Sequence, residues 1–329
     1  MNLLIKTSDN DGRLARIPEF LTTAWRIEVA DERDRKAFSE ALSRAHACIS
    51  MQWPKDMPAA PHLKLLHLPG AGIDAIDFAA VPAGATVCNV FEHEIGISEY
   101  VMASMLQWMI PIPQLQADLR RGQWHGSYLF GPVHGELFGK TLGIVGYGHI
   151  GREVAKRASA FGMQVHACSH TARPGDPVVA SVQGMEQLDS LLAESDFVLL
   201  ALPLTDKTNG VIGSHQLATM KPTGVIINVA RGALIEEAAL YAALRDKRIG
   251  GAIIDTWYRY PPAKNSTCEP SQFPFHELDN VIMTPHASAW TDQLIYRRNR
   301  VIAGNLDRLR RNEPLVNVVK RTTTEQVPC

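Results

Sequence analysis

Apolar residues in this chain occur in short, dense runs that alternate with longer stretches of helical periodicity. The short runs predict buried β-strands, and the longer stretches predict amphipathic helices. In the N-terminal third a helix is expected over Asp34–Arg44. The strands expected there are Leu3–Lys6, Arg26–Val29, Ala47–Met51, Lys64–Leu68 and Thr86–Asn89. This alternation predicts a parallel sheet covered by helices.

The same alternation resumes after an apolar helix expected over Ile97–Met109, which Pro111 and Pro113 should close. The later strands are expected at Thr141–Val145, Gln164–Cys168, Phe197–Leu200, Val225–Asn228, Ala252–Ile254 and Val281–Met283. The later helices are expected at Ile150–Phe161, Met185–Ala193, Ser214–Thr219, Glu236–Arg245 and near Thr291–Arg311. This order predicts a second, doubly wound α/β domain. A long loop with a functional placement is expected over Tyr258–Pro274.

Composition narrows the class of protein. The 329 residues are 46% hydrophobic and 20% charged, which is typical of a globular protein with room for two domains. The net charge of −1 favours neither a nucleic acid nor a membrane partner, and we interpret the arginine-rich last helix as a solvated or interface-lining face. The five scattered cysteines and the absence of an evident signal peptide predict a cytoplasmic protein without a disulfide framework or metal site.

A glycine motif follows one predicted strand and opens the next helix. Residues 146–151 read Gly-Tyr-Gly-His-Ile-Gly. Gly146 permits a tight turn, Gly148 lets the backbone approach a pyrophosphate, and Gly151 lets the helix pack close to the strand. The backbone of His149 and Ile150 would then offer N–H groups to the phosphates. The motif predicts a dinucleotide-binding site.

The end of the following strand bears on the choice between NAD and NADP. An NAD site usually places an acid there to bind the adenosine ribose, and this chain has none. Ser169, His170 and Arg173 would instead suit a 2′-phosphate. We therefore expect NADP to be slightly favoured over NAD, although NAD without the acid stays open.

Two further residues have the chemistry needed to oxidise a hydroxy acid. His286 follows a predicted strand, and His is the side chain best suited to exchange a proton at neutral pH. Arg231 also follows a strand, and a guanidinium can bind a carboxylate and polarise a carbonyl. Both lie where ligands bind in doubly wound sheets.

These segments together resemble the D-isomer-specific 2-hydroxyacid dehydrogenases. The resemblance rests on the glycine motif, on Asn228–Gly232, on Thr284–His286 and on the Asp255–Tyr260 segment. It implies a flavodoxin-like substrate domain, 1–97 with 288–329, and a Rossmann NAD(P)-binding domain, 98–287. It also implies a homodimer in which the region 114–140 packs across the partner.

The resemblance assigns roles residue by residue. It implies that His286 is the acid–base and that Arg231 binds the substrate. Ala71 and Gly72 would offer backbone N–H groups to the substrate carboxylate, and Asp255 would hold the nicotinamide carboxamide. The cofactor would also contact Leu202, Pro203, Thr208, Val229 and Ala230.

One position departs from the family pattern. The family's catalytic Glu stands five residues after the Asp, and here Tyr260 stands there. Tyr260 would orient His286 without stabilising its protonated form, so that the His pKa stays low. Alternatively Glu269 reaches back to His286, or the substrate is unusual, as formate is in a related branch.

Aromatic residues border the expected substrate pocket. Trp53 and Trp290 are expected to line it, together with Trp257, Tyr258 and Tyr260. Such a pocket favours an unphosphorylated substrate. Glu92, His93 and Glu94 have poor spacing for a metal site, and we expect none.

The sequence therefore predicts an oxidoreductase that transfers a hydride between NAD(P) and a small 2-hydroxy or 2-keto acid, with glyoxylate or hydroxypyruvate reduction as one concrete version. Two alternatives stay open. One is an atypical, formate-like oxidation in the same fold, and the other is a dinucleotide-binding regulator without efficient catalysis.

Overall fold

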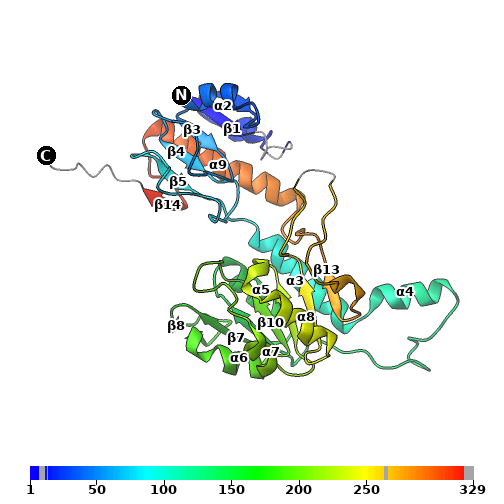
Figure 1. Cartoon of the computed structure of the whole chain (residues 1–329). Helices are drawn as coiled ribbons and strands as arrows, with labels where there is room; N and C mark the ends of the chain where they lie inside the picture. Colours follow the sequence, from blue (N-terminus) through cyan, green and yellow to red (C-terminus); the bar gives the residue numbers. More distant parts are fainter. Residues whose placement is uncertain (7–11, 13, 263–265, 322–329) are drawn as a thin grey trace. The chain divides into compact units, whose positions relative to one another are not determined.

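The computed structural model describes residues 1–6, 12, 14–262 and 266–321 (Figure 1). The chain divides into two compact units. The first unit comprises Met1–Glu92 and Thr291–Cys329, and the second comprises His93–Trp290. Each contains its own sheet and its own core.

The sheet of the first unit has the order β14-β5-β4-β3-β1-β2. Strands β1 to β5 are parallel, and β14 joins β5 antiparallel. The order β2-β1-β3-β4-β5 is that of flavodoxin-like folds. The strands are β1 Asn2–Lys6, β2 Arg26–Ala30, β3 Ala47–Ile49, β4 Leu65–His67, β5 Thr86–Cys88 and β14 Val318–Arg321; the helices are α1 Ile17–Phe20, α2 Arg35–Ser43 and α9 Asp292–Arg311.

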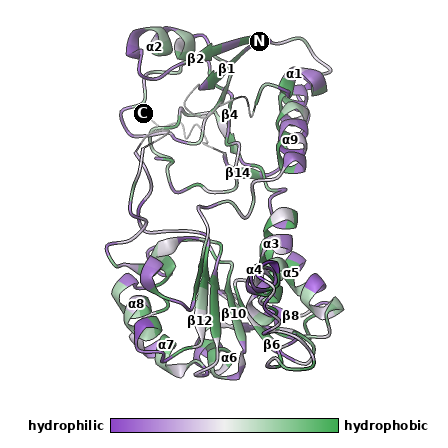
Figure 2. Ribbon diagram, turned by 90° about the vertical axis from the view of Figure 1, so that its right-hand side faces the viewer, coloured by the Kyte–Doolittle hydropathy of each residue, from purple (hydrophilic) through white to green (hydrophobic). Residues whose placement is uncertain are grey.

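Alternate strand residues of the first unit pack on opposite faces of the sheet. On one face Leu4 and Leu66 pack with Phe38 of α2. On the other face Leu3 and Leu65 pack with α9. Figure 2 shows α2 on one side of this sheet and α1 and α9 on the other. Because the side-chain period of a strand is two, buried residues on both faces produce the continuous apolar runs seen in the sequence.

The sheet of the second unit has the order β13-β12-β11-β10-β6-β7-β9-β8. Its strands are parallel except for β8, which pairs antiparallel with β9. The strands are β6 Thr141–Val145, β7 Gln164–Ser169, β8 Arg173–Pro174, β9 Ser181–Gly184, β10 Phe197–Leu200, β11 Val225–Asn228, β12 Gly251–Ile254 and β13 Val281–Met283. The chain reverses direction across the sheet between β6 and β10, as in a Rossmann fold, and the expected α/β class is confirmed.

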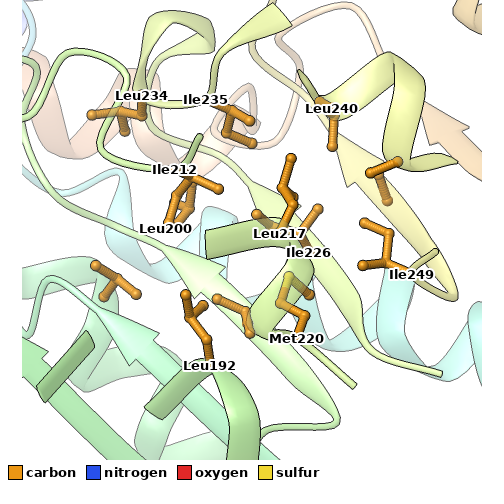
Figure 3. Close-up of a cluster of buried hydrophobic side chains, with 14 of the residues drawn as sticks. Leu192, Leu200, Ile212, Leu217, Met220, Ile226, Leu234, Ile235, Leu240 and Ile249 are labelled. Carbon is orange, nitrogen blue, oxygen red and sulfur yellow. The ribbon is translucent and has the colours of Figure 1, made fainter. Parts of the chain in front are cut away.

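Helices cover both faces of this second sheet. They are α3 Glu94–Met109, α5 His149–Ala160, α6 Leu188–Glu194, α7 Ser214–Thr219 and α8 Glu237–Arg245, with 3₁₀ turns η2 Met185–Gln187, η3 Gly232–Leu234 and η4 Phe275–Glu277. Helix α4 Ile112–Arg120 instead projects away from this sheet (Figure 1). Figure 3 shows the core on one face, where Leu200 and Ile226 of the sheet meet Leu217 of α7 and Leu240 of α8. On the other face Leu199 and Ile227 pack with α3 and α5 residues such as Val101 and Val154.

Two features of the second unit differ from the prediction. Helix α4 begins directly after Pro111, and Pro113 lies in its first turn, where the missing N–H of a proline costs nothing. The short strands β8 and β9 lack the long apolar run used to identify strands. Among the described residues no helix has the length and apolarity to cross a bilayer.

Candidate active site

The glycine motif forms a tight turn between β6 and α5. Gly146 has φ +102°, and a Cβ there would lie 2.6 Å from the backbone nitrogen of Leu202. A Cβ on Gly151 would lie 2.5 Å from the carbonyl oxygen of Gly146. These contacts require glycine at both positions. A side chain on Gly146 would separate the turn from the loop that follows β10, and a side chain on Gly151 would separate α5 from the turn.

Gly148 is different, since a Cβ there would have no neighbour within 4 Å. It caps α5 without a side chain, so no cap side chain of its own competes for the first N–H groups of this 12-residue helix. Free N–H groups and the positive end of the helix dipole attract a phosphate. The open space above Gly148 and these donors fit a dinucleotide pyrophosphate.

The expected adenosine side of this site lies at the end of β7. The hydroxyl of Ser169 donates to the carbonyl oxygen of Thr171 at 2.8 Å, and the guanidinium of Arg173 donates to the carbonyl oxygen of Tyr147. The side chains of His170 and Arg173 are exposed. The structure therefore brings Arg173 against the glycine turn.

Asp176 is a residue near this turn that the sequence did not single out. Its carboxylate accepts a hydrogen bond from the Tyr147 hydroxyl at 2.9 Å and bonds from the N–H groups of Val178 and Val179. Asp176 comes several residues after the end of β7, whereas the ribose-binding acid of a Rossmann motif stands at the strand end itself. Its observed contacts tie the segment after β7 to the glycine turn.

The loop after β10 is held by its own polar groups. The Thr208 hydroxyl donates to the carbonyl oxygen of Pro203 at 2.7 Å and accepts from the N–H of Thr205 at 2.8 Å. Leu202 is buried beside the glycine turn. These contacts fix the backbone of the loop at the carboxyl edge of the sheet. The family resemblance predicts cofactor contacts at this loop.

Arg231 is presented by a short turn after β11. The side chain of Asn228 donates to the carbonyl oxygen of Arg231 at 2.8 Å and accepts from the N–H of Ala230 at 3.1 Å. The side chains of Val229 and Ala230 are buried, so these residues present their backbone at the carboxyl edge of the sheet. A Cβ on Gly232 would lie 2.5 Å from the carbonyl oxygen of Trp257, so glycine lets this turn lie against the Trp257–Tyr260 segment.

The Tyr260 hydroxyl lies 3.0 Å from Nδ1 of His286. The same hydroxyl oxygen accepts a hydrogen bond from the backbone N–H of Trp257 at 3.1 Å. The charge of Arg231 acts on both rings: it opposes the rise that desolvation causes in the pKa of Tyr260, and it adds to the fall that desolvation causes in the pKa of His286. The fold therefore brings Arg231, Tyr260 and His286 together from three different segments.

His286 has a left-handed backbone conformation, with φ +56°. Such a conformation is unfavourable for a residue other than glycine and persists only where its surroundings hold it. The carboxylate of Asp255 accepts hydrogen bonds from the N–H groups of Ala287 at 2.8 Å and Ser288 at 2.9 Å. It also accepts one from the Thr284 hydroxyl at 2.6 Å. These bonds fix the turn that presents the imidazole.

The surroundings of His286 favour its neutral form. Desolvation by the surrounding protein lowers its pKa, the Asp255 carboxylate opposes that change, and the Arg231 charge lowers the pKa further. Desolvation also raises the pKa of Tyr260, so its phenol stays neutral. The group at Nδ1 of His286 is thus an uncharged hydroxyl.

Comparison with known proteins places this site in a family. Residues 102–288 match the family model "D-isomer specific 2-hydroxyacid dehydrogenase, NAD binding domain". The chain is 36% identical over 260 residues to a glycerate dehydrogenase of Methylorubrum extorquens, which covers 74% of this chain and 77% of that protein. The chain belongs to the D-isomer specific 2-hydroxyacid dehydrogenase family.

Two further comparisons define how far the similarity extends. A D-3-phosphoglycerate dehydrogenase of Methanocaldococcus jannaschii is 37% identical over 314 residues, which are 94% of this chain, and the chain spans 58% of the length of that protein. The crystallised 2-hydroxyacid dehydrogenase of Ketogulonicigenium vulgare Y25 superposes with a TM-score of 0.80 at 24% identity, covering 97% of this chain and 98% of that chain. The second similarity confirms the two-domain α/β fold of the family.

Glu269 does not contact His286. Its side chain is 76% exposed, and its carboxylate lies 4.0 Å from Nδ1 of His276. The adjoining Pro270 carbonyl accepts hydrogen bonds from the N–H groups of Tyr258 and Arg259. Because Glu269 is exposed beside His276 and Tyr260 is the group at Nδ1 of His286, the alternative in which Glu269 partners His286 is wrong for this structure.

The aromatic residues expected around the substrate separate into buried and exposed ones. Trp53 is fully buried in the core of the first unit, and its indole N–H donates to the carbonyl oxygen of Ala80. Its expected substrate contact is wrong here, because close packing leaves no surface for a ligand. Trp257 is also buried and donates to the carbonyl oxygen of Thr284. Tyr260 and Trp290 are 48% and 50% exposed.

The expected carboxylate-binding loop lies in the first unit. Ala71 and Gly72 are partly exposed, and the carbonyl oxygen of Ala71 accepts a hydrogen bond from the Asn89 side chain at 3.0 Å. The carbonyl oxygen of Gly70 accepts one from the N–H of Val90. Both carbonyl groups are therefore held, which orients the backbone of this loop.

Asp255 is fully buried, and its carboxylate accepts hydrogen bonds from the turn around His286. The family resemblance implies a nicotinamide contact for Asp255, and the structure adds a supporting contact to this turn that no sequence pattern indicates. Around Glu92, His93 and Glu94, and throughout the described part of the chain, no group of three or more metal-binding side chains is arranged to hold an ion.

Proposed function

We propose that this protein is an NAD(P)-dependent dehydrogenase that interconverts a small 2-hydroxy acid and the corresponding 2-keto acid. The observation that carries the proposal is the convergence of Arg231, Tyr260 and His286 at the carboxyl edge of a Rossmann sheet that also bears the glycine turn. A cation and an acid–base beside a dinucleotide site are the groups that this reaction needs.

Each residue would have a separate role. Arg231 binds the substrate carboxylate and polarises the keto oxygen, since a guanidinium can form two parallel hydrogen bonds. His286 uses Nδ1 for the Tyr260 contact, which leaves Nε2 to exchange a proton with the substrate oxygen. The bound dinucleotide supplies or accepts the hydride.

Tyr260 would orient the imidazole without adding charge. Keto-acid reduction consumes a proton, so the imidazole must be protonated when hydride arrives. The lowered pKa of His286 means that the protonated fraction falls at a lower pH than for an unperturbed imidazole. Reduction should therefore weaken as pH rises past the folded pKa, and oxidation should strengthen.

We also propose a preference for NADP over NAD. Ser169 ends β7 in place of an acid, and the exposed guanidinium of Arg173 lies against the glycine turn. A 2′-phosphate would gain charge-assisted hydrogen bonds there. The preference would appear as a lower KM for NADPH than for NADH.

The substrate we propose is unphosphorylated, with glyoxylate or hydroxypyruvate as examples. The exposed aromatic rings of Tyr260 and Trp290 suit an uncharged substrate tail. We further propose that the protein is cytoplasmic, because its scattered cysteines lack the spacing typical of a disulfide framework. We also propose a homodimer, because the segment 114–140 exposes a set of large apolar side chains. These are Leu119, Trp124, Tyr128, Leu129, Phe130, Val133 and Phe138.

The decisive experiment measures reduction of glyoxylate, hydroxypyruvate and phosphohydroxypyruvate with NADPH and with NADH. Native protein and the variants Arg231→Ala and His286→Asn are compared, and cofactor binding is measured separately by fluorescence. We expect turnover of the unphosphorylated acids by the native protein, and a large loss in both variants with cofactor affinity retained. Native protein that binds NADPH but reduces none of these acids would refute the proposal.

A further inference from the structure

A phenol on α3 contacts the turn that carries His286. The hydroxyl of Tyr100 lies 2.7 Å from the Thr284 hydroxyl oxygen, and the Thr284 hydroxyl lies 2.6 Å from Oδ1 of Asp255. The carboxylate can only accept, so the Thr284 hydrogen points to Asp255. The Thr284 oxygen must then accept from Tyr100, which fixes the direction of both hydrogen bonds.

Desolvation keeps Tyr100 a neutral donor. The phenol is partly buried, and desolvation raises its pKa above the ordinary value. A tyrosine that stays protonated across the working pH range donates its hydrogen throughout that range. The Thr284 hydroxyl is therefore held toward Asp255 while Tyr100 stays protonated.

The chain of hydrogen bonds ends at the backbone on the far side of His286. The Asp255 carboxylate that receives the Thr284 hydrogen also holds the N–H groups of Ala287 and Ser288. The carbonyl of Thr284 is held from another direction by the Trp257 indole N–H at 2.8 Å. Both ends of the short turn are thus fixed, and the unfavourable φ of +56° at His286 lies between them.

We propose that Tyr100 is a positioning residue for His286, acting through the Thr284 hydroxyl and the Asp255 carboxylate to hold the left-handed turn. The imidazole is attached to this turn and has its Nδ1 hydrogen bond to Tyr260 as a side-chain restraint. A small rotation of the turn would move Nε2 away from the substrate oxygen. The catalytic part of this inference rests on the proposed dehydrogenase function.

The variant Tyr100→Phe removes the donor and keeps the ring. We expect kcat for keto-acid reduction to fall about fivefold, the factor that one neutral hydrogen bond is worth, while KM for the keto acid and cofactor affinity stay unchanged. The matched control is Tyr241→Phe, because the Tyr241 ring packs on Phe273 and Phe275 and is not a member of the hydrogen-bonded chain from Tyr100 to Asp255. The control should keep native kcat.

A double-variant cycle separates positioning from general destabilisation. Thr284→Val removes the hydroxyl through which Tyr100 would act, so adding Tyr100→Phe to Thr284→Val should produce no further fall in kcat. If Tyr100 only stabilised the fold, the fall in kcat caused by Tyr100→Phe and the fall caused by Thr284→Val would multiply in the double variant. Multiplying effects, or a native kcat in Tyr100→Phe, would overturn the proposal.

Backbone hydrogen exchange tests the same network without any activity. In Tyr100→Phe the N–H groups of Ala287 and Ser288 should exchange at least several-fold faster than in native protein, while those of β11 keep their native rates. Unchanged exchange at Ala287 and Ser288 would overturn the positioning role. Faster exchange in a protein that reduces no keto acid would retain that structural role and refute the proposed function alone.

Discussion

The substitution Tyr260→Glu replaces a neutral hydroxyl beside His286 with a carboxylate. The phenol oxygen lies 3.0 Å from Nδ1 of the imidazole. A unit charge about 4 Å away contributes about 1 kcal/mol in water and about 4 kcal/mol near a protein surface. Because Tyr260 is 48% exposed, the lower part of that range applies. The pKa of His286 should then rise by about one unit.

The assay is kcat/KM for hydroxypyruvate reduction measured from about pH 5 to pH 10. Reduction needs protonated His286, so the rate falls about tenfold per pH unit above the folded pKa. In Tyr260→Glu this alkaline fall should begin about one pH unit higher than in native protein. Tyr260→Gln is the neutral control and should keep the native profile.

The outcome that refutes this reasoning is specific. Equal profiles for Tyr260→Glu and Tyr260→Gln would mean that charge at this position does not govern the protonation of His286. Tyr260→Phe adds a check on orientation, since it removes the hydroxyl. It should lower kcat without moving the pH at which reduction declines.

Three further predictions concern the turn, the cofactor and the first unit. Gly146→Ala should abolish dinucleotide binding and lower Tm, because the added Cβ would clash with the backbone nitrogen of Leu202. NADPH affinity equal to that of the native protein, measured by fluorescence titration, would contradict this prediction. Arg173→Ala should raise KM for NADPH about tenfold or more and leave KM for NADH unchanged, and equal changes for the two cofactors would refute the 2′-phosphate role. Full burial lowers the pKa of His67 from 6.5 to about 4, so the unfolded chain binds more protons between those pH values. Stability should therefore fall by about 3 kcal/mol as pH drops from 6.5 to 4, as measured by urea unfolding, and His67→Gln should lose most of this dependence.

The sequence alone determined the elements and the type of site. The strands Thr141–Val145 and Phe197–Leu200 have the bounds that the sequence predicts, because Leu142–Val145 and all of Phe197–Leu200 are buried on both faces and carry no polar side chain. Gly146 and Gly151 were identified as obligatory because a turn between a strand and a helix leaves no room for a side chain. Arg231 and His286 were placed correctly at the carboxyl edge because each follows a strand of a parallel sheet.

Tertiary structure decided which side chains meet. The sequence left Tyr260 and Glu269 as alternative partners of His286, and in the structure Tyr260 is the group at Nδ1 of the imidazole while Glu269 is exposed. The sequence also predicts Trp53 as a residue of the substrate pocket, whereas in the structure its side chain is fully buried in the core of the first unit.

The support of His286 by Tyr100 and Asp255 was also invisible in the sequence. These residues are far apart along the chain and come from three different elements, α3, the end of β12 and the turn after β13. Local patterns of apolar and polar residues report how each segment packs, whereas directional hydrogen bonds between distant segments depend on the folded arrangement of all of them.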